Sequence, residues 1–369
     1  MKQTLIISAG TLTNDGYQSR IEMEMELLRD YFDFVIVTSI QSKGVSVRVP
    51  CDIVYYDVNI HKYKIMNFCS NRKLFRKCLS DVLKKYKNPI VYCESLMPLL
   101  RSLRISKKQS VPCVYDCHGI QPVEYRLYHP NLKGWLYSQY LSLKEKRYVK
   151  QCNLIITVTD KQYAIWNCNT KYCKLPMIPG EEFLRNPLSN KEEVREKLGI
   201  PIDSIVFVYS GGTNKWQMCS ETMKIYSEIE KSIPNSYMLV LSHDIITFQK
   251  LSEEYDIRKI KILSAEYHEM PYYLSACDYG FCIREDNIIN NVASPTKLLE
   301  YLARNITPIM SNKIGEYSEL FRDNKLAIIV DDYQCFHFGK CSMKSGVEFV
   351  HKYKEDVVKN YIQSVTSIK

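Results

Sequence analysis

The sequence predicts an α/β protein with two doubly wound parallel sheets, and three observations lead to this fold class. Short runs of β-branched and aromatic residues recur along the chain, separated by helical stretches. Most of these runs are apolar throughout instead of alternating, as is typical of strands covered on both faces. The chain has 369 residues, which is enough for two domains with separate cores. We therefore expect two Rossmann-like halves of about six strands each.

The elements of both halves follow one another as strand and helix. In the first half, strands are expected at 4–9, 34–39, 52–56, 89–93, 112–116 and 154–159. Helices are expected there at 17–30, 67–86 and 134–150. In the second half, strands are expected at 204–210, 236–242, 259–263, 279–283, 307–311 and 326–330. Helices are expected there at 216–232 and 295–304, and apolar residues at helical spacing predict a last amphipathic helix over 346–369.

The boundary between the halves is a stretch in which proline and glycine interrupt regular structure. It contains Pro176, Pro179, Gly180, Pro187 and Pro201. We expect an N-terminal domain on the acceptor side of a ligand cleft at 1–185, a C-terminal domain on the donor side at 186–345, and the final helix at 346–369.

The composition excludes several classes of protein. Hydrophobic residues make up 46% of the chain and charged residues 25%, as in soluble globular proteins, and no apolar run reaches the length of a membrane span. The first residues, MKQTLIISAG, lack a cleavage pattern and predict a strand instead of a signal peptide. The 14 cysteines are scattered and form no CxxC pair, so we expect reduced thiols and a cytoplasmic location.

The net charge of +9 comes largely from basic stretches of the first half, at 62–87 and 101–108. Two interpretations remain open: solvated helix faces, and contact with an anionic surface such as the inner face of a membrane. Nucleic acid is not expected as a partner, because no recognition motif accompanies the charge.

Ligands of doubly wound domains bind beyond the carboxyl ends of the strands. After the first strand a loop leads to Gly16, where a helix N-terminus favours anions, although the GxGxxG motif of nicotinamide sites is absent. After the fifth strand, His118 can donate a hydrogen bond to a sugar hydroxyl. The alternatives are an ordinary turn at Gly16 and, for His118, a core histidine or a metal site with Cys113 and Cys117.

Two loops of the second half predict a phosphate site. In YSGGTNKW, Gly211 and Gly212 form a tight turn, and Lys215 stands at the start of the next helix. In SPTKLLEYLA, Ser294 is expected as the N-cap and Pro295 as the first helical residue. A plain glycine turn and a capped core helix are the alternatives.

The helix that opens at Pro295 is expected to hold a nucleoside diphosphate. The N–H groups of Thr296, Lys297 and Leu298 would face the phosphates, with the Lys297 ammonium beside them. Glu300 can accept hydrogen bonds from both hydroxyls of a ribose, as acidic residues do in other nucleotide sites.

These segments, taken in order, resemble the retaining glycosyltransferases of the GT-B fold, in particular the large family 4 (glycosyl transferases group 1). The resemblance spans nearly the whole chain. The segments that carry it are NDGYQSRIEMEMELL, EKRYVKQCNLIITVTDKQY, REKLGIPIDSIVFVYSGGTNKWQ, and EMPYYLSACDYGFCIRED with SPTKLLEYLARNITPIMS. The last pair resembles the family's donor-site signature and is the most specific.

The resemblance implies roles for several residues. Glu300 would bind the ribose as the last Glu of the family's paired-Glu motif, and the amides of Ser294 to Leu298 would bind phosphate. Lys215 matches the family's phosphate-binding Lys, and His118 its cleft His.

The chain departs from the family at the first Glu of the pair, which falls on Val292. In the family this residue contacts the transferred sugar. The residues that could replace it here are Arg284, Glu285, Asn290 and Asn291.

The resemblance also implies an activity. We expect a hexosyltransferase-type enzyme that moves a sugar from a nucleotide-sugar to a lipid-linked or polysaccharide acceptor, with retention at the anomeric carbon, in cell-surface polysaccharide biosynthesis. The C-terminal helix would cross back onto the first domain. Amides and cations would stabilise the leaving nucleoside diphosphate, so no metal and no other cofactor is expected. The alternatives are a nucleotide-sugar epimerase of the same fold and a catalytically silent module that binds carbohydrate or a partner protein.

Overall fold

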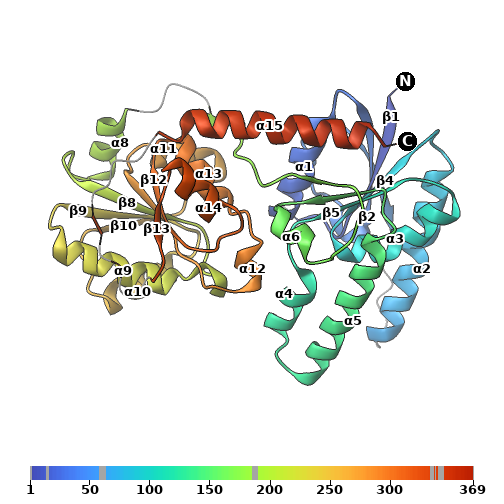
Figure 1. The fold of residues 1–369 in the computed structure, drawn as a ribbon, viewed down its shortest axis with the longest axis horizontal. Helices are drawn as coiled ribbons and strands as arrows, with labels where there is room; N and C mark the ends of the chain where they lie inside the picture. Colours follow the sequence, from blue (N-terminus) through green and yellow to red (C-terminus); the bar gives the residue numbers. More distant parts are fainter. Residues whose placement is uncertain are drawn as a thin grey trace. The chain divides into compact units, whose positions relative to one another are not determined.

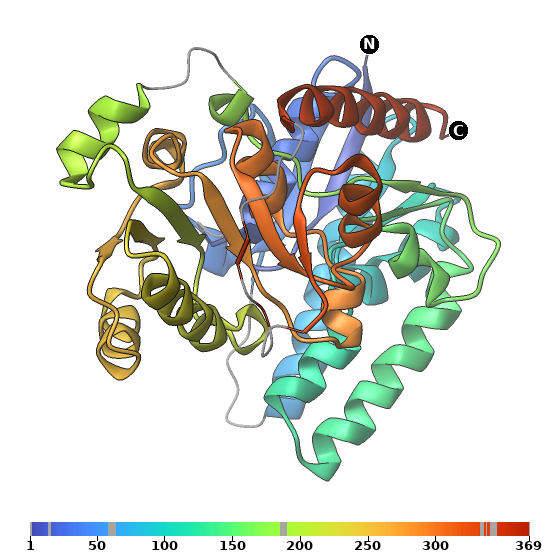
Figure 2. The same cartoon turned by 60° about the vertical axis from the view of Figure 1, so that its left-hand side comes forward.

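The computed structural model describes residues 2–13, 16–57, 64–184, 190–332, 336, 338, 339 and 345–368. They belong to two compact units, one of Met1–Leu175 with Val357–Lys369 and one of Pro176–Asp356. Each unit contains one parallel sheet with helices packed against it (Figure 1, Figure 2). Among the described helices, none is long and apolar enough to cross a membrane.

The first unit contains a seven-stranded sheet of order β3-β2-β1-β4-β5-β6-β7, in which each pair is parallel. Its strands are β1 (Gln3–Ser8), β2 (Phe32–Ser39), β3 (Asp52–Tyr56), β4 (Ile90–Glu94), β5 (Cys113–Cys117), β6 (Leu154–Thr157) and β7 (Tyr172–Lys174). Its helices are α1 (Gly16–Leu28), η1 (Ile40–Ser42), α2 (Lys64–Leu83), α3 (Leu96–Lys108), α4 (Gln121–Tyr128), α5 (Leu132–Val149) and α6 (Asp160–Ala164). This is the doubly wound strand order of a Rossmann domain.

The second unit contains a six-stranded parallel sheet of order β10-β9-β8-β11-β12-β13. Its strands are β8 (Ile205–Ser210), β9 (Ser236–Leu241), β10 (Ile260–Leu263), β11 (Tyr279–Cys282), β12 (Thr307–Ser311) and β13 (Ile328–Val330). The helices that accompany them are α7 (Glu181–Leu184), α8 (Lys191–Leu198), η2 (Lys215–Gln217), α9 (Cys219–Ser232), α10 (Ile245–Glu254), η3 (Tyr267–Glu269), α11 (Met270–Leu274), α12 (Ile288–Asn291), α13 (Thr296–Ala303), α14 (Tyr317–Asn324) and α15 (Val347–Thr366).

The apolar runs form strands because both faces of each sheet are covered. In β1, Leu5 and Ile7 enter one core cluster and Ile6 enters the cluster on the other face. In β8, Val206 and Phe207 divide between two clusters in the same way. The predicted fold class is therefore confirmed.

The structure adds one strand to those expected and divides the chain earlier. The edge strand β7 lies in KYCK, which contains no continuous apolar run from which a strand could be predicted. The residues after Leu175 go with the second unit, because Phe183 is buried in its core. Helix α15 contributes Val350 to the second core and Tyr361 and Val365 to the first, so the chain returns to the first unit as the fold class implies.

Candidate functional site

The loop after β8 requires glycine at position 211. The φ of Gly211 is +133°, a conformation that L side chains rarely adopt. A Cβ placed there would lie 2.8 Å from Gln217 Oε1 and 3.0 Å from Lys297 Nζ. The predicted glycine turn therefore brings its backbone directly against the ammonium of α13. Gly212 follows it, and its carbonyl accepts a hydrogen bond of 2.6 Å from the Tyr209 hydroxyl.

Lys297 lies at the centre of this group. Its Nζ is 4.5 Å from the centroid of the Tyr209 ring and donates to Gln217 Oε1 at 3.4 Å. Burial, together with the positive charge of Arg284, lowers the pKa of Lys297 to about 8. Within the part of the chain that the structure describes, no carboxylate forms an ion pair with this ammonium, so its charge is available to an anionic ligand.

Arg284 follows β11 and is fixed beside the same loop. Its Nη1 donates to the carbonyl of Trp216 at 2.9 Å, and its backbone N–H donates to Ser311 Oγ at 2.8 Å. Two cationic side chains from different elements thus lie at the carboxyl ends of β8 and β11, where doubly wound sheets bind ligands.

The first turn of α13 differs from the expectation. Pro295 is the N-cap and the helix starts at Thr296, so the prediction that Ser294 caps it was wrong: the Ser294 hydroxyl instead hydrogen-bonds to the Tyr317 hydroxyl at 2.9 Å. The N–H of Leu298 donates to the Pro295 carbonyl at 3.2 Å. The N–H groups of Thr296 and Lys297, which have no acceptor within the helix, are then the amides that this turn offers to a phosphate.

Glu300 lies one turn after Lys297 and is buried. Burial raises the pKa of its carboxyl to about 7, while the Tyr267 hydroxyl, which hydrogen-bonds to it, and the Lys297 ammonium act in the opposite direction. Glu182 of α7 adds a further increase. A buried carboxyl beside an ammonium can accept hydrogen bonds from neutral hydroxyls while the ammonium faces a phosphate.

The residues near Val292 divide by whether their polar atoms are already used. Val292 itself is buried. Asn290 is buried and donates from Nδ2 to the Glu285 carbonyl at 3.0 Å. Asn291 donates from Nδ2 to Asp286 Oδ1 at 3.0 Å, whereas its Oδ1 is buried and, among the described residues, accepts no hydrogen bond. Asn291 therefore has an acceptor to offer to a ligand.

Lys215 lies in η2 and is exposed. Among the described residues, no hydrogen bond or ion pair connects it to the group around Lys297. The structure therefore brings Gly211, Arg284, Lys297 and Glu300 together and leaves Lys215 at the edge of this group.

In the first unit, His118 follows β5 and is held by carboxylates. Its Nε2 hydrogen-bonds to Asp116 Oδ2 and lies 3.1 Å from Glu94 Oε2. The ring also lines a cavity of about 120 Å³ together with Tyr17, Ser95 and other residues. Because Nε2 is anchored, Nδ1 is the ring atom left to meet a hydroxyl of a ligand.

A buried charge cluster lies behind His118. The Arg20 guanidinium contacts Asp116 Oδ1 at 3.2 Å and Glu24 Oε1 at 2.7 Å. Burial alone would raise the pKa of Asp116, but Arg20 and His118 hold it below its usual value. Burial raises the pKa of Glu24 and of Glu94. Arg20 thus joins Asp116 and Glu24 in one buried group next to His118.

The sulfur atoms of the two cysteines considered as metal ligands have partners other than His118. Cys113 Sγ lies 3.7 Å from Cys93 Sγ, and Cys117 Sγ lies 3.1 Å from the Gly119 carbonyl. Glu24, Asp116 and His118 could each offer a ligand atom within 4.8 Å of the others, but Arg20 already supplies a cation to both carboxyl groups. The cysteines whose side chains the structure describes are free thiols.

Helix α1 starts at Gly16, as the sequence predicts. The loop before it is held by the next residue, Tyr17. The Gly10 N–H donates to the Tyr17 hydroxyl at 2.9 Å, and that hydroxyl donates to the Glu94 carbonyl at 3.3 Å. The amide of Gly10, in the loop between β1 and α1, is thus used by Tyr17.

Several residues of both groups were not expected from the sequence. In the second unit these are Tyr209, Gln217 and Tyr267; in the first they are Arg20, Glu24 and Glu94. The spacing of Arg20 and Glu24, four residues apart on a helix with an otherwise apolar face, was an available signal. The other residues meet only through tertiary packing.

Comparison with solved structures agrees with the fold. HepE of Anabaena in complex with UDP has a TM-score of 0.66 at 12% sequence identity, covering 100% of this chain and 95% of its own. Sucrose-phosphate synthase from Thermosynechococcus elongatus has a TM-score of 0.64 at 12% identity, covering 100% and 94%. A glycosyltransferase from Rickettsia africae has a TM-score of 0.64 at 15% identity, covering 99% and 92%.

These neighbours define the class of fold. The chain has the GT-B fold, with the Rossmann-like units that such glycosyltransferases share. It matches no model of a protein family and no curated protein.

Proposed function

We propose that the protein is a retaining glycosyltransferase that moves a sugar from a nucleoside-diphosphate sugar to an acceptor. One observation carries the proposal. The ammonium of Lys297, in the first turn of α13, lies against the backbone of Gly211 and has no ion-pair partner in the described structure. The buried Glu300 follows one helical turn later. A diphosphate provides the anion for Lys297, and a ribose provides the hydroxyls for Glu300. Solved structures of HepE contain UDP and UDP-glucose, which agrees with this assignment.

The chemistry follows from where charge develops. When the bond between the anomeric carbon and the diphosphate breaks, the leaving oxygen gains negative charge. Lys297, Arg284 and the amides of Thr296 and Lys297 stabilise that charge more strongly than they stabilise the donor, which lowers the barrier. We also assign Lys215, exposed on η2, to the bound phosphate. The chain's own cations perform this task, so the proposal includes no metal and no other cofactor.

Each unit offers one polar group to a ligand. In the second unit, Asn291 Oδ1, which accepts no hydrogen bond from the described residues, is assigned to a hydroxyl of the transferred sugar in place of the carboxylate that Val292 lacks. In the first unit, His118, anchored through Nε2 by Asp116, offers Nδ1 to a ligand hydroxyl. We assign the acceptor to the lipid-linked or polysaccharide class, in cell-surface polysaccharide biosynthesis at the cytoplasmic face of a membrane. The net charge of +9 supports such a location.

Thermal stabilisation tests the donor site. UDP-, GDP-, dTDP-, ADP- and CMP-sugars are added to the native protein and to Glu300→Ala, since a ligand that binds the folded state raises the melting temperature. We expect one nucleotide class to stabilise the native protein and to lose most of this effect in the variant. Stabilisation of both proteins alike by every nucleotide would place the donor elsewhere.

Product analysis then separates the possible activities. With the stabilising donor and a lipid-linked acceptor, a glycosyltransferase releases nucleoside diphosphate only when a sugar–acceptor product forms, and NMR of that product reports the anomeric configuration. Release without transfer would indicate an epimerase, and binding without turnover would indicate a silent module. Inversion at the anomeric carbon would contradict the retaining mechanism.

A further inference from the structure

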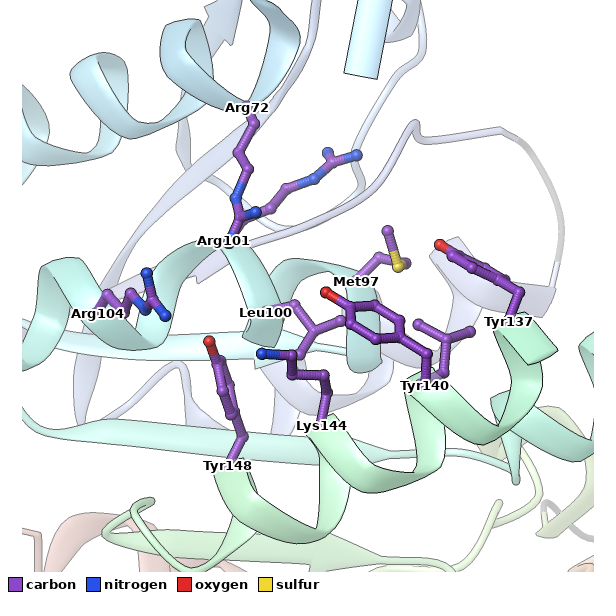
Figure 3. A pocket seen from close by; sticks show the side chains of 10 residues that line it. Arg72, Met97, Leu100, Arg101, Arg104, Tyr137, Tyr140, Lys144 and Tyr148 are labelled. Atoms are coloured by element: carbon purple, nitrogen blue, oxygen red, sulfur yellow. The ribbon is translucent and has the colours of Figure 1, made fainter. Parts of the chain in front are cut away.

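The first unit contains a second pocket, lined by cationic side chains, between α2, α3 and α5. Its volume is about 110 Å³. Arg72 enters it from α2, Arg101 and Arg104 from α3, and Lys144 from α5 (Figure 3). Among the residues that the structure describes, no Asp or Glu lines it. Positive charges from three helices thus converge on one small volume without a negative charge within it.

The hydrogen bonds around this pocket are incomplete. Arg72 Nε and, one turn further along α2, Arg76 Nε and Nη2 are buried and have no hydrogen-bond partner among the residues that the structure describes. Burial and the nearby Arg72 and Arg104 cations lower the pKa of Arg76. Buried polar nitrogens are normally paired, and buried like charges are costly. An anion in the pocket would give Arg72 a partner and would offset the repulsion between Arg72, Arg104 and the neighbouring Arg76.

Among the arginines of the pocket, Arg101 already has a hydrogen-bond acceptor and an aromatic neighbour. Arg101 Nη1 donates to the Tyr56 hydroxyl at 3.2 Å, and its guanidinium lies 6.0 Å from the centroid of the Phe75 ring. Lys144 Nζ lies 5.5 Å from the centroid of the Tyr140 ring. Arg72 and Lys144 line the pocket from two different helices, α2 and α5 (Figure 3), and we assign these two cations to the anion.

An exposed apolar face adjoins the pocket. Along α5, Leu132, Leu136, Tyr140 and Leu143 are 72%, 55%, 49% and 70% exposed. Their spacing of four, four and three residues places them on one side of the helix, and Trp135 beside them is exposed as well. Tyr140 belongs both to this face and to the pocket wall. Contiguous exposed apolar side chains of this kind mark a surface that binds something apolar.

We propose that the pocket binds the phosphate group of an anionic phospholipid while the exposed face of α5 enters the interfacial layer of the bilayer. The cations account for the phosphate, and the apolar face accounts for a lipid as its source, because a free phosphate ion would leave that face unused. Aromatic and leucine side chains beside lysine and arginine are the composition of helices that lie in a membrane interface. The site is separate from the residues assigned to the donor and does not depend on the proposed activity.

Vesicle binding of the full chain, without any nucleotide-sugar, tests the proposal. Phosphatidylcholine vesicles with and without phosphatidylglycerol are mixed with the native protein, with Arg72→Gln/Lys144→Gln, and with the control Lys43→Gln/Lys87→Gln. Both double variants lose the same net charge, and Lys43 and Lys87 are exposed outside the pocket. We expect the pocket variant to bind the anionic vesicles about thirtyfold more weakly and the control to bind almost as the native protein does.

A second pair of measurements separates the lipid from a free anion. Leu132→Ser/Leu143→Ser removes apolar contacts at exposed positions and is expected to weaken vesicle binding without lowering the melting temperature. Inorganic phosphate is tested by thermal stabilisation. Equal binding by the pocket and control variants would refute the pocket, and stabilisation by inorganic phosphate with no binding to anionic vesicles would refute the lipid as its source. Neither result would bear on glycosyl transfer.

Discussion

Raising the pH from about 7 to about 9 should weaken the binding of a nucleoside diphosphate through the loss of one charge. Burial lowers the pKa of Lys297 to about 8, so the free protein holds this proton at neutral pH and releases it within that range. Only the protonated ammonium attracts a phosphate. Binding above the pKa must therefore be accompanied by proton uptake.

The magnitude follows from the protonated fraction. About nine tenths of the Lys297 side chains carry the proton one unit below the pKa and about one tenth one unit above it, so the affinity should fall by about tenfold. Replacing the residue shows the full value of the charge. A hydrogen bond to a charged group contributes about 1.5–3 kcal/mol, so Lys297→Met should bind about ten- to a hundredfold more weakly at neutral pH.

Isothermal titration calorimetry with UDP measures both quantities. Titrations in buffers of different ionisation enthalpy report the protons taken up on binding, and Lys297→Met provides the control for titration of the ligand itself. We expect proton uptake above about pH 8 in the native protein and none from this source in the variant. Equal pH dependence in both proteins would refute the assignment of Lys297 as the phosphate ligand.

Three further predictions concern the two units separately. Burial raises the pKa of Glu300 from 4.5 to about 7 in the folded protein. The native protein should therefore lose about 3 kcal/mol of stability relative to Glu300→Gln as the pH rises through that window. Urea unfolding on either side of the window measures this difference, and no difference would be found if the carboxyl were solvated. Gly211→Ala places a Cβ 2.8 Å from Gln217 Oε1 at a φ of +133°, so it should lower the stability of the folded protein by about 1–3 kcal/mol and weaken UDP binding. Gly212→Ala, whose Cβ would have its nearest contact at 3.8 Å, is the control. Equal melting temperatures of the two variants would contradict backbone strain at Gly211. Asp116→Asn should destabilise by about 3–5 kcal/mol because it removes a carboxylate that pairs with the buried Arg20 guanidinium. Glu94→Gln should be less damaging, because burial raises the pKa of that carboxyl and Arg20 forms its ion pairs with Asp116 and Glu24. Chemical denaturation of both variants measures the two effects, and a larger loss of stability in Glu94→Gln would contradict this assignment.

The fold was predictable because its signals are local. Continuous apolar runs announce strands that are buried on both faces, and each expected strand was found. The strand β7 was missed because three residues with a lysine carry no such pattern. Its place is set by pairing with β6, which the sequence of the segment does not encode.

The candidate site was predictable in part. The order of Gly211, Lys297 and Glu300 along the chain indicated one phosphate and ribose site, and the structure brings the first two into contact. The cap was wrong because the Ser294 hydroxyl is taken by Tyr317, a choice made by tertiary packing. The carboxyl groups behind His118 were missed for the same reason, since Glu24 and Glu94 lie far apart in sequence and meet only in the folded unit.

During synthesis, the core of the first unit can be completed only after helix α15 has been made. Tyr361 and Val365 fill its core, and the Tyr361 hydroxyl lies 3.0 Å from that of Tyr92 in the buried interior. A ribosome delivers residues 176–356 before these side chains exist, so the second unit can be whole while the first still has an open core. A domain that begins the chain would ordinarily fold first during synthesis. In this protein, residues 1–175 cannot complete their core until Tyr361 and Val365 of α15 have been synthesised.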